Sequence, residues 1–315
     1  MATQLLGVDA MAAWNDPKTT DFYLYATGSK SGVQRIGVRN GGRLHTVSEI
    51  TSVDARSAFN LISSYAGVTV NEQYADAETT LLDETRVQFM HPPVTLAPKM
   101  TWRKSIIKEA TFEALGETSA YNAEKIAFLR YCVDERLTVC FVGATGHGKT
   151  TGGKAYMHDQ KRYQDRRRFI IIQDRNEVRP PLETVEYYFV TKARLDHPGY
   201  SGAYLLKLAL SDDPDILVYG ELRDAETCGQ HKQAMNTGHG GGFASYHANE
   251  INDGYHRYGD WVEESGMTRL NPQLARLLPV MVYCYIDERS NEFRTKVGHT
   301  TGFEQGESKY ELIGE

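Results

Sequence analysis

Cysteine is scarce in this sequence, and no two cysteines have the spacing of a metal or redox motif. The four cysteines among the 315 residues stand at positions 132, 140, 228 and 284. Without a CxxC pair, neither a zinc ribbon nor a thioredoxin-type redox site is indicated. Cys140 and Cys284 lie within apolar runs, so we expect them in the core, and a reducing compartment fits this cysteine usage.

Long hydrophobic runs are also missing. The longest, LLPVMVYCYI, covers only the ten residues from Leu277 to Ile286. A membrane-spanning helix needs about 20 such residues, so this run predicts a buried strand instead. The first ten residues, MATQLLGVDA, contain no basic residue and make a poor signal peptide. We therefore expect a cytoplasmic protein without a membrane span, which meets the inner membrane only through partners.

An excess of positive charge is absent too. The sequence has 35 Lys and Arg residues against 41 Asp and Glu residues, which gives a net charge of −6. Domains whose main task is to hold nucleic acid usually carry a basic footprint, so nucleic acid is not expected to be the primary partner. One local basic run, KRYQDRRR from Lys161 to Arg168, is interpreted as a solvated helix end.

The first third of the sequence has the pattern of a small α+β domain. Short β-rich runs alternate there with one stretch of helical spacing, Ser57 to Ala66, which stops at Gly67. We therefore predict an amino-terminal α+β domain over residues 1–105, and a polar linker with a short helix over residues 106–120. The predicted strands of this domain are Phe22–Ala26, Val33–Val38, Arg86–Phe89 and Met100–Arg103.

Residues 121–315 have a different pattern, in which continuous apolar runs alternate with helical stretches. Strands buried on both faces have this composition, as in a mostly parallel sheet flanked by helices. The sequence therefore predicts a doubly wound α/β domain, whose ligands bind at the carboxyl ends of the strands. The predicted strands are Leu137–Val142, Phe169–Gln173, Asp215–Tyr219 and Val280–Ile286, and the predicted helices are Asn122–Val133, Lys149–His158, Tyr204–Leu210 and Ala225–Asn236.

The segment GATGHGKT matches the phosphate-binding pattern G-x-x-x-x-G-K-[ST] between a predicted strand and a predicted helix. Its glycines allow the backbone N–H groups to turn toward phosphate oxygens, and the helix N-terminus adds positive potential. Lys149 would supply a charge to the β- and γ-phosphates of ATP, and the Thr150 hydroxyl would bind Mg²⁺. The predicted nucleotide-binding residues are Gly143, Ala144, Thr145, Gly146, His147, Gly148, Lys149, Thr150 and Thr151.

Acidic residues follow two of the predicted strands. Glu221 comes just after DILVY, where a carboxylate can face the γ-phosphate, hold Mg²⁺ directly or through water, or activate the attacking water. Asp174 and Glu177 follow FIIIQ, and they either position water or metal or are turn residues before two prolines. We expect Lys149, Glu177 and Glu221 to be the catalytic residues, and which glutamate is the general base stays open.

Two histidines frame a glycine-rich segment, GHGGGFASYH. The glycines allow a sharp turn into the predicted strand FASY, and His247 follows that strand. A neutral imidazole at such a position can sense the γ-phosphate or a neighbouring acid. We therefore predict His239 and His247 as sensors, and no metal site from this pair.

Taken in order, these segments resemble the secretion-traffic ATPases of type II and type IV secretion, which include pilus-retraction motors and conjugation ATPases. The resemblance covers roughly residues 80–300 and resides in RVQFMHPPV, MTWRK, GATGHGKTT, FIIIQDRNE, DPDILVYGELRDAET and TGHGGGFASYHANE. The first two look like amino-domain strands, and the others like a Walker A motif, an Asp box, an atypical Walker B motif and a His box. The branch it resembles most is the Dot/Icm-type ATPase DotB with TraJ-like conjugation ATPases, since no four-cysteine subdomain is present. His147 before Gly148, Gln173 at the start of the Asp box and three consecutive glycines in the His box depart from the family pattern.

The resemblance implies a RecA-like P-loop ATPase domain behind a small PAS-like amino-terminal domain, assembled as a homohexameric ring. Such a ring works at the cytoplasmic face of the inner membrane with a secretion or conjugation complex. With ATP and Mg²⁺ bound, hydrolysis would drive inter-domain motion that energises substrate transfer or machine assembly. Arginines from another domain or subunit stabilise charge on the γ-phosphate in such motors. The candidates here are Arg86, Arg103 and Arg194, each of which could equally form an ordinary surface ion pair.

Two other functions are compatible with the phosphate-loop pattern. The chain could be a nucleic-acid-translocating ring ATPase, although the net charge of −6 disfavours it. It could also be a non-motor nucleotide-dependent docking switch that turns ATP over very slowly, although an acid at position 221 disfavours that function.

Overall fold

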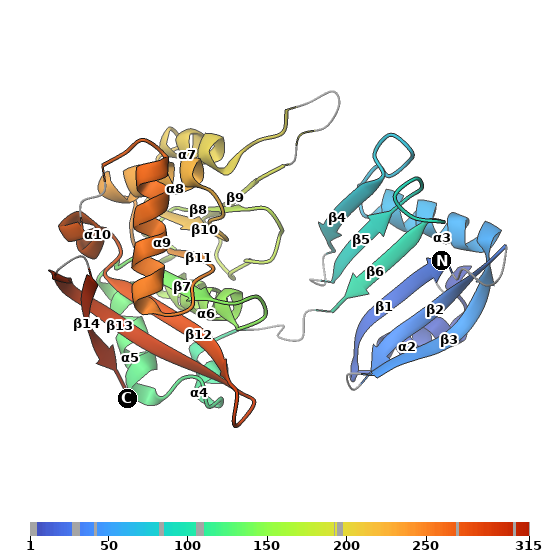
Figure 1. Ribbon diagram of the computed structural model, residues 1–315, viewed down its shortest axis with the longest axis horizontal. Helices are drawn as coiled ribbons and strands as arrows, with labels where there is room; N and C mark the ends of the chain where they lie inside the picture. Colours follow the sequence, from blue (N-terminus) through green and yellow to red (C-terminus); the bar gives the residue numbers. More distant parts are fainter. Residues whose placement is uncertain are drawn as a thin grey trace. The chain divides into compact units, whose positions relative to one another are not determined.

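The computed structural model describes residues 5–26, 32–40, 43–81, 85–104, 110–191, 193, 198–268, 271–304 and 307–314. The chain divides into two compact units, Met1–Lys108 and Glu109–Glu315 (Figure 1). The first unit contains the helices α2 (Val8–Asn15) and α3 (Ser52–Tyr65) and the strands β1 (Thr19–Ala26), β2 (Val33–Asn40), β3 (Arg43–Thr51), β4 (Asp76–Thr80), β5 (Arg86–Met90) and β6 (Lys99–Arg103).

The first unit is a six-stranded antiparallel sheet in the order β3-β2-β1-β6-β5-β4. Alternate residues of β1, Phe22 and Leu24, are fully buried, because one face of the sheet packs against α2 and α3. The predicted strands are all present, whereas α2, β3 and β4 add to the prediction. Helix α3 begins five residues before the predicted start, since the Thr51 side chain caps it by accepting a hydrogen bond from the Asp54 amide at 3.1 Å.

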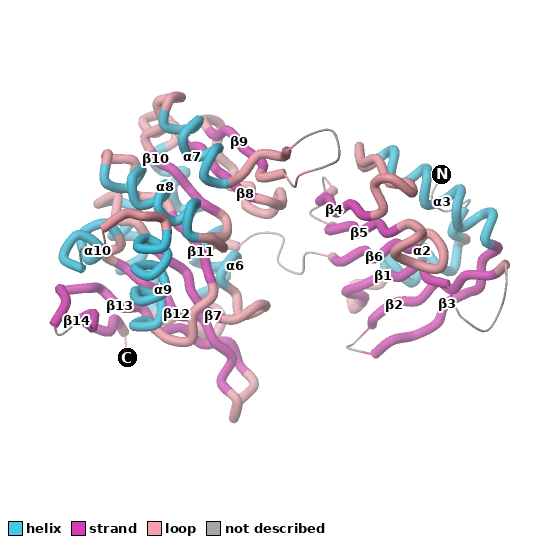
Figure 2. The backbone as a smooth tube through the Cα atoms, turned by 45° about the horizontal axis from the view of Figure 1, so that its top comes forward, coloured by secondary structure: helices cyan, strands magenta, loops and turns pink. Residues whose placement is uncertain are grey.

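Helices and strands alternate through much of the second unit (Figure 2). Its helices are α4 (Phe112–Gly116), α5 (Ala123–Asp134), α6 (Lys149–Asp159), the 3₁₀-helix η1 (Gln160–Tyr163), α7 (Gly202–Leu210), α8 (Ala225–Asn236), α9 (Ile251–Glu264) and α10 (Asn271–Leu277). Its strands are β7 (Val139–Gly143), β8 (Phe169–Gln173), β9 (Val185–Phe189), β10 (Ile216–Tyr219), β11 (Phe243–Tyr246), β12 (Val280–Asp287), β13 (Glu292–Glu304) and β14 (Glu307–Ile313).

These strands form one eight-stranded sheet in the order β14-β13-β12-β7-β11-β10-β8-β9. The six strands from β12 to β9 are parallel, and β13 and β14 extend the sheet antiparallel. One hydrophobic core holds α4, α5 and α6 against one face, and a second holds α7, α8, α9 and α10 against the other. Burial on both faces explains the continuous apolar runs, and it confirms the predicted α/β class.

Two sequence predictions gain detail here. Of the run from Leu277 to Ile286, Leu277 ends α10 and the residues from Val280 onward form a strand, β12, whose residues are buried or half-buried. Within the described ranges no helix combines the length and the apolar character needed to cross a membrane. The stretch 106–120, expected to be a linker, joins the second unit from Ala110 onward, because Ala110, Phe112 and Leu115 are buried in that unit's core. All four cysteines are buried and unpaired, as Cys140 and Cys284 were expected to be.

Candidate nucleotide-binding site

The predicted site residues collect at the carboxyl edge of the parallel strands. The strands lie there in the order β7, β11, β10 and β8. Each ends in a segment that sequence analysis singled out: β7 in the phosphate-loop segment, β11 in His247, β10 in the Gly220–Glu221 pair and β8 in Asp174. Parallel pairing with matched register, such as Tyr219 opposite Ile172 and Tyr246 opposite Val142, brings these four ends together.

The loop between β7 and α6 has a backbone that only glycine adopts easily. Gly143 has φ +146°, and a Cβ atom there would overlap the carbonyl oxygen of Cys284 on the adjacent strand β12. Gly148 has φ +90° and precedes the first residue of α6 without any side-chain cap. The uncapped first turn leaves its N–H groups facing the loop, which is the arrangement that binds phosphate. Thr150 and Thr151 are half-buried in that turn, while Ala144, Thr145 and Gly146 are exposed.

Lys149 is buried at the base of this loop. Its ammonium group donates hydrogen bonds to the carbonyl oxygens of Gly143 and Ala144, both at 2.9 Å. Burial lowers the pKa of Lys149, and the nearby Glu221 carboxylate opposes that shift. The ammonium group of Lys149 is therefore bonded by two neutral carbonyl oxygens. A charged phosphate oxygen would form a stronger hydrogen bond with it and could replace them.

Glu221 lies at the centre of a charged cluster. Its Oε2 atom accepts a hydrogen bond from Arg223 at 2.6 Å, and its Oε1 atom lies 3.0 Å from Nε2 of His247. Burial alone would raise the pKa of Glu221, but Arg223 first, and His247 and Lys149 after it, outweigh burial and hold that pKa below its ordinary value. Glu221 is therefore ionised at neutral pH, and its charge acts on Lys149 across the site.

The acids after β8 lie at the same edge. Arg223 joins Asp174 to Glu221, since its Nη1 atom donates to the Asp174 carboxylate at 2.6 Å. Gln173 shapes the turn that holds Glu177: its Oε1 atom accepts from the amides of Glu177 at 3.1 Å and Val178 at 2.9 Å, while its Nε2 atom donates to the Val178 carbonyl at 3.3 Å. A carboxylate could not make the donated bond, so the amide that departs from the family pattern has a structural role here.

The two histidines are separated by the length of β11. His239 lies at the opposite, amino edge of the sheet, where its Nδ1 atom bonds the Pro214 carbonyl at 2.8 Å and its own carbonyl accepts from the Leu217 amide at 3.2 Å. Because the strand is parallel to its neighbours, one histidine at its start and one at its end cannot share an edge. His239 therefore lies at the edge opposite the phosphate loop of its own chain, and its sensor role stays a prediction, whereas His247 contacts Glu221 directly.

Two of the candidate arginines, Arg86 and Arg103, belong to the first unit. Arg103 forms an ion pair with Asp21 at 2.7 Å within the first unit. Arg86 lies opposite Arg103 in the pairing of β5 with β6, so the two guanidinium groups share one face of that sheet. Arg194 lies outside the described residues.

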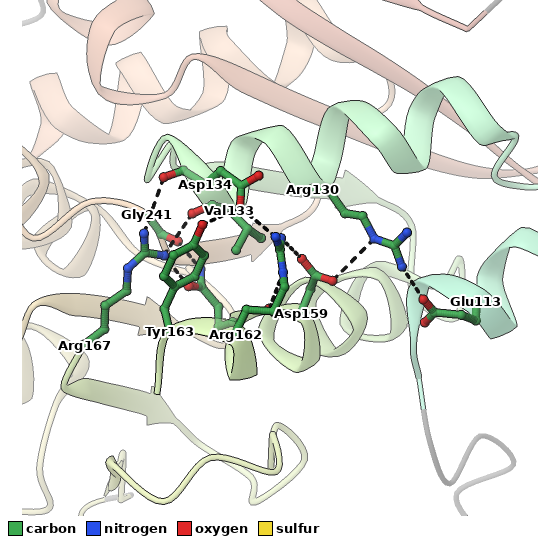
Figure 3. Close-up of polar contacts among 10 residues, drawn as sticks. Glu113, Arg130, Val133, Asp134, Asp159, Arg162, Tyr163, Arg167 and Gly241 are labelled. Atoms are coloured by element: carbon green, nitrogen blue, oxygen red, sulfur yellow. Dashed lines mark hydrogen bonds and ion pairs between the residues drawn. The ribbon is translucent and has the colours of Figure 1, made fainter. Parts of the chain in front are cut away.

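Three arginines of the basic run from Lys161 to Arg168, namely Arg162, Arg167 and Arg168, are engaged with neighbouring groups. Figure 3 shows Arg162 directed at Asp134, and the Nη1 atom of Arg162 lies 2.9 Å from the Oδ1 atom of Asp134. The Cζ atom of Arg167 lies over the ring of Tyr163, 3.8 Å from the ring centroid. Further partners of the run's arginines are Val133, Asp159, Glu186 and Asp212. These contacts hold helix ends together at the amino edge of the sheet, which agrees with the interpretation of the run as a helix end. The paired arginines leave less positive charge available for nucleic acid.

Arg223 and Tyr121 are the site neighbours that sequence analysis missed. Arg223 stands two residues after Glu221 in a segment that had been quoted, and the alternation of a strand end would have placed both side chains on one side. Tyr121 comes from the start of α5, far away in sequence, and its hydroxyl lies against the first turn of α6. No local sequence pattern predicts such a contact between residues that are distant in the sequence.

Comparison with known proteins gives a consistent result. The family described as "Type II/IV secretion system protein" matches residues 45–281. The probable conjugal transfer protein TrbB of Sinorhizobium fredii is 24% identical over 285 residues, which cover 89% of this chain and 82% of that protein. The protein VirB11 of Rhizobium radiobacter is 26% identical over 196 residues, 62% of this chain, and the chain covers only 56% of that relative's length.

Two solved structures share the fold. The pilus retraction motor PilT with bound ADP superposes with a TM-score of 0.63 at 18% identity, covering 94% of this chain and 81% of that chain. The ATPase DotB of Legionella pneumophila superposes with a TM-score of 0.61 at 14% identity, covering 94% and 80%. Since the family match spans more than half of the sequence, the chain belongs to the Type II/IV secretion system protein family.

Proposed function

We propose that the chain is an ATP-hydrolysing motor of a type IV secretion or conjugation system. The observation that carries this proposal is the carboxyl edge of the second unit, where a phosphate loop with a buried lysine faces the ionised Glu221. One group suits the triphosphate, and the other suits the water that attacks it. In this proposal the second unit is a RecA-like ATPase domain and the antiparallel first unit is a PAS-like domain.

Each side chain of the cluster then has a distinct task. Lys149 transfers its hydrogen bonds from Gly143 and Ala144 to the β- and γ-phosphates. Glu221 orients the attacking water and accepts its proton, while His247 keeps that carboxylate turned toward the γ-phosphate. Glu177, in the turn after β8, is the second candidate base.

The donor set also fits Mg²⁺. Thr150 begins α6, and the Glu221 and Asp174 carboxylates end neighbouring strands, whereas Mg²⁺ needs only one or two protein oxygens beside phosphates and water. Bound there, Mg²⁺ would neutralise charge on the phosphates. Arg223 donates to one oxygen of each of these two carboxylates, so it already neutralises part of the negative charge that Mg²⁺ would meet.

Assembly and location are proposed from the family membership rather than from the site. The relatives named for conjugal transfer and the likeness to PilT and DotB support a homohexameric ring at the cytoplasmic face of the inner membrane, working with a secretion or conjugation complex. Arg86 and Arg103 are the candidates for reaching the γ-phosphate of another domain or subunit.

The test is ATP turnover by the purified protein. Lys149→Ala should abolish nucleotide binding, and Glu221→Gln should keep binding and stop hydrolysis. Normal turnover in both variants would refute the assignment, while strong stimulation by single-stranded DNA with a steep salt dependence would indicate a nucleic-acid translocase instead. Solution mass with and without ATP tests the hexamer.

A further inference from the structure

The hydroxyl group of Tyr121 is buried without a nitrogen or oxygen partner. Only 4% of the residue is exposed, and within the described part of the chain no nitrogen or oxygen atom bonds its hydroxyl, while the Cys284 thiol offers a weak partner. Buried polar groups are almost always paired, because an unpaired one loses its bonds to water without replacement. A buried hydroxyl with only a thiol beside it, next to a binding loop, therefore calls for an explanation in terms of that loop.

The hydroxyl lies directly against the helix that carries Lys149. A Cβ atom added at Gly152, in the first turn of α6, would lie 2.7 Å from the Tyr121 hydroxyl oxygen. The Gly152 amide donates to the Gly148 carbonyl at 2.9 Å, so this turn is continuous with the phosphate loop. Any movement of the phosphate loop and of this first turn of α6 therefore changes which atoms the Tyr121 hydroxyl contacts.

Cys284 connects the hydroxyl to the loop electrostatically. Its thiol interacts with both Tyr121 and Lys149, and its residue pairs with Gly143 in the register of β12 and β7. Burial first, and Cys284 after it, raise the pKa of Tyr121, so the hydroxyl keeps its proton and is available as a donor.

The segment around Tyr121 is fastened to β13 and cannot easily adjust. Arg294 donates to the Ser119 carbonyl at 3.1 Å, and Thr295 donates to the Ala120 carbonyl. Lys125, in the first turn of α5, donates to the Thr295 carbonyl at 2.7 Å. The hydroxyl therefore stays in place, and the loop is the part that can move toward it.

We propose that Tyr121 is a positioning residue that favours the nucleotide-bound form of the phosphate loop. Its hydroxyl has no nitrogen or oxygen partner while Lys149 bonds the loop's own carbonyls, and it gains a stronger hydrogen bond than the thiol offers when nucleotide draws Lys149 away and the first turn of α6 shifts. The inference rests on the proposed ATP binding. A bond made only in the bound form adds its whole free energy to nucleotide affinity, because affinity depends on the difference between the two states.

Tyr156 supplies a matched control. It is fully buried in the same core as Tyr121 and lies on α6 itself. Its hydroxyl already donates to the Leu137 carbonyl at 2.7 Å, away from the loop. Replacing each tyrosine by phenylalanine removes one hydroxyl in each case: that of Tyr121 without an oxygen partner, and that of Tyr156 with one.

The experiment compares Tyr121→Phe with Tyr156→Phe. The melting temperature is measured without nucleotide, and the dissociation constant is measured for Mg²⁺ with a non-hydrolysed ATP analogue. We expect Tyr121→Phe to melt at the same or a higher temperature than wild type and to bind the analogue about three- to tenfold more weakly, the value of one net hydrogen bond. Tyr156→Phe should melt lower and bind as wild type does.

Two results would overturn the inference. One is analogue affinity within twofold of wild type in Tyr121→Phe. The other is a melting temperature of Tyr121→Phe lowered as much as that of Tyr156→Phe, since a merely structural hydroxyl behaves in that way. If wild type itself fails to bind the analogue, the proposed function fails, and this inference falls with it.

Discussion

Gly143→Ala is a sharp test of how the phosphate loop is built. Gly143 ends β7 at φ +146°, and its Cα faces the backbone of Cys284 on β12. An added methyl group would overlap a carbonyl oxygen that is fixed within the sheet. Either β7 and β12 separate at this point, or the loop leaves its present conformation.

The magnitude can be worked out by comparison with Gly148→Ala. Gly148 also has positive φ, +90°, but a Cβ atom there would meet nothing within 4 Å. That variant pays only the backbone strain, about 1–2 kcal/mol. Gly143→Ala adds an overpacking penalty of about 1–3 kcal/mol to a similar strain, about 3.5 kcal/mol together. At roughly 2–4 °C per kcal/mol for a domain of this size, the expected falls in melting temperature are about 10 °C for Gly143→Ala and about 4 °C for Gly148→Ala.

The assay is thermal unfolding of both variants without nucleotide, followed by circular dichroism. Measuring without nucleotide separates the packing of the loop from its role in phosphate binding. Equal falls in melting temperature for the two variants would show that the close approach to Cys284 is not a constraint, and the account of the loop would then be wrong.

Two further predictions concern charge. Arg223→Gln removes the cation that bonds both Glu221 and Asp174, so the effect of burial should dominate and raise the pKa of Glu221. The acid limb of the pH profile of ATP turnover should therefore move to higher pH. An acid limb at the same pH as in wild type would contradict this prediction. Burial lowers the pKa of His231 from 6.5 to about 4, since its Nε2 atom is buried without a partner and only Nδ1 is bonded, to the Tyr258 hydroxyl at 2.8 Å. The unfolded chain then binds the proton first as pH falls, so stability is lost from about pH 6.5 downward and the loss reaches about 3 kcal/mol below pH 4. In urea unfolding at pH 7 and pH 4.5, His231→Gln should lose about 2 kcal/mol less than wild type on acidification, and equal losses would contradict the assignment.

The α/β class of the second unit could be predicted because its strands are buried on both faces. Runs such as Phe169–Gln173 are apolar throughout, and the structure has β8 over those same residues. The antiparallel strands β13 and β14 escaped prediction, since Glu292–Glu304 mixes exposed and buried positions around a register shift between Thr300 and Gly302. Polar strands at the end of a sheet give a weak pattern in one sequence.

The candidate site was predictable where it is local. The segment from Gly143 to Thr150 is contiguous, so its spacing alone indicates phosphate binding. The contacts that adjust the charge and packing of the site are not local in sequence. Arg223 links the ends of two strands, and Tyr121, which precedes β7 in the sequence, contacts α6, which follows β7. His239 shows the converse, because two histidines that are close in sequence lie at opposite ends of one strand.

The central claim is that Lys149 grips a triphosphate that Glu221 faces. The most direct test is an experimental structure of the chain with Mg²⁺ and a non-hydrolysed ATP analogue. We predict that the Lys149 ammonium leaves the carbonyls of Gly143 and Ala144 for the β- and γ-phosphates, with the Glu221 carboxylate on the γ-phosphate side. An analogue bound away from the loop, or a Lys149 that still bonds both carbonyls beside a bound analogue, would contradict the account.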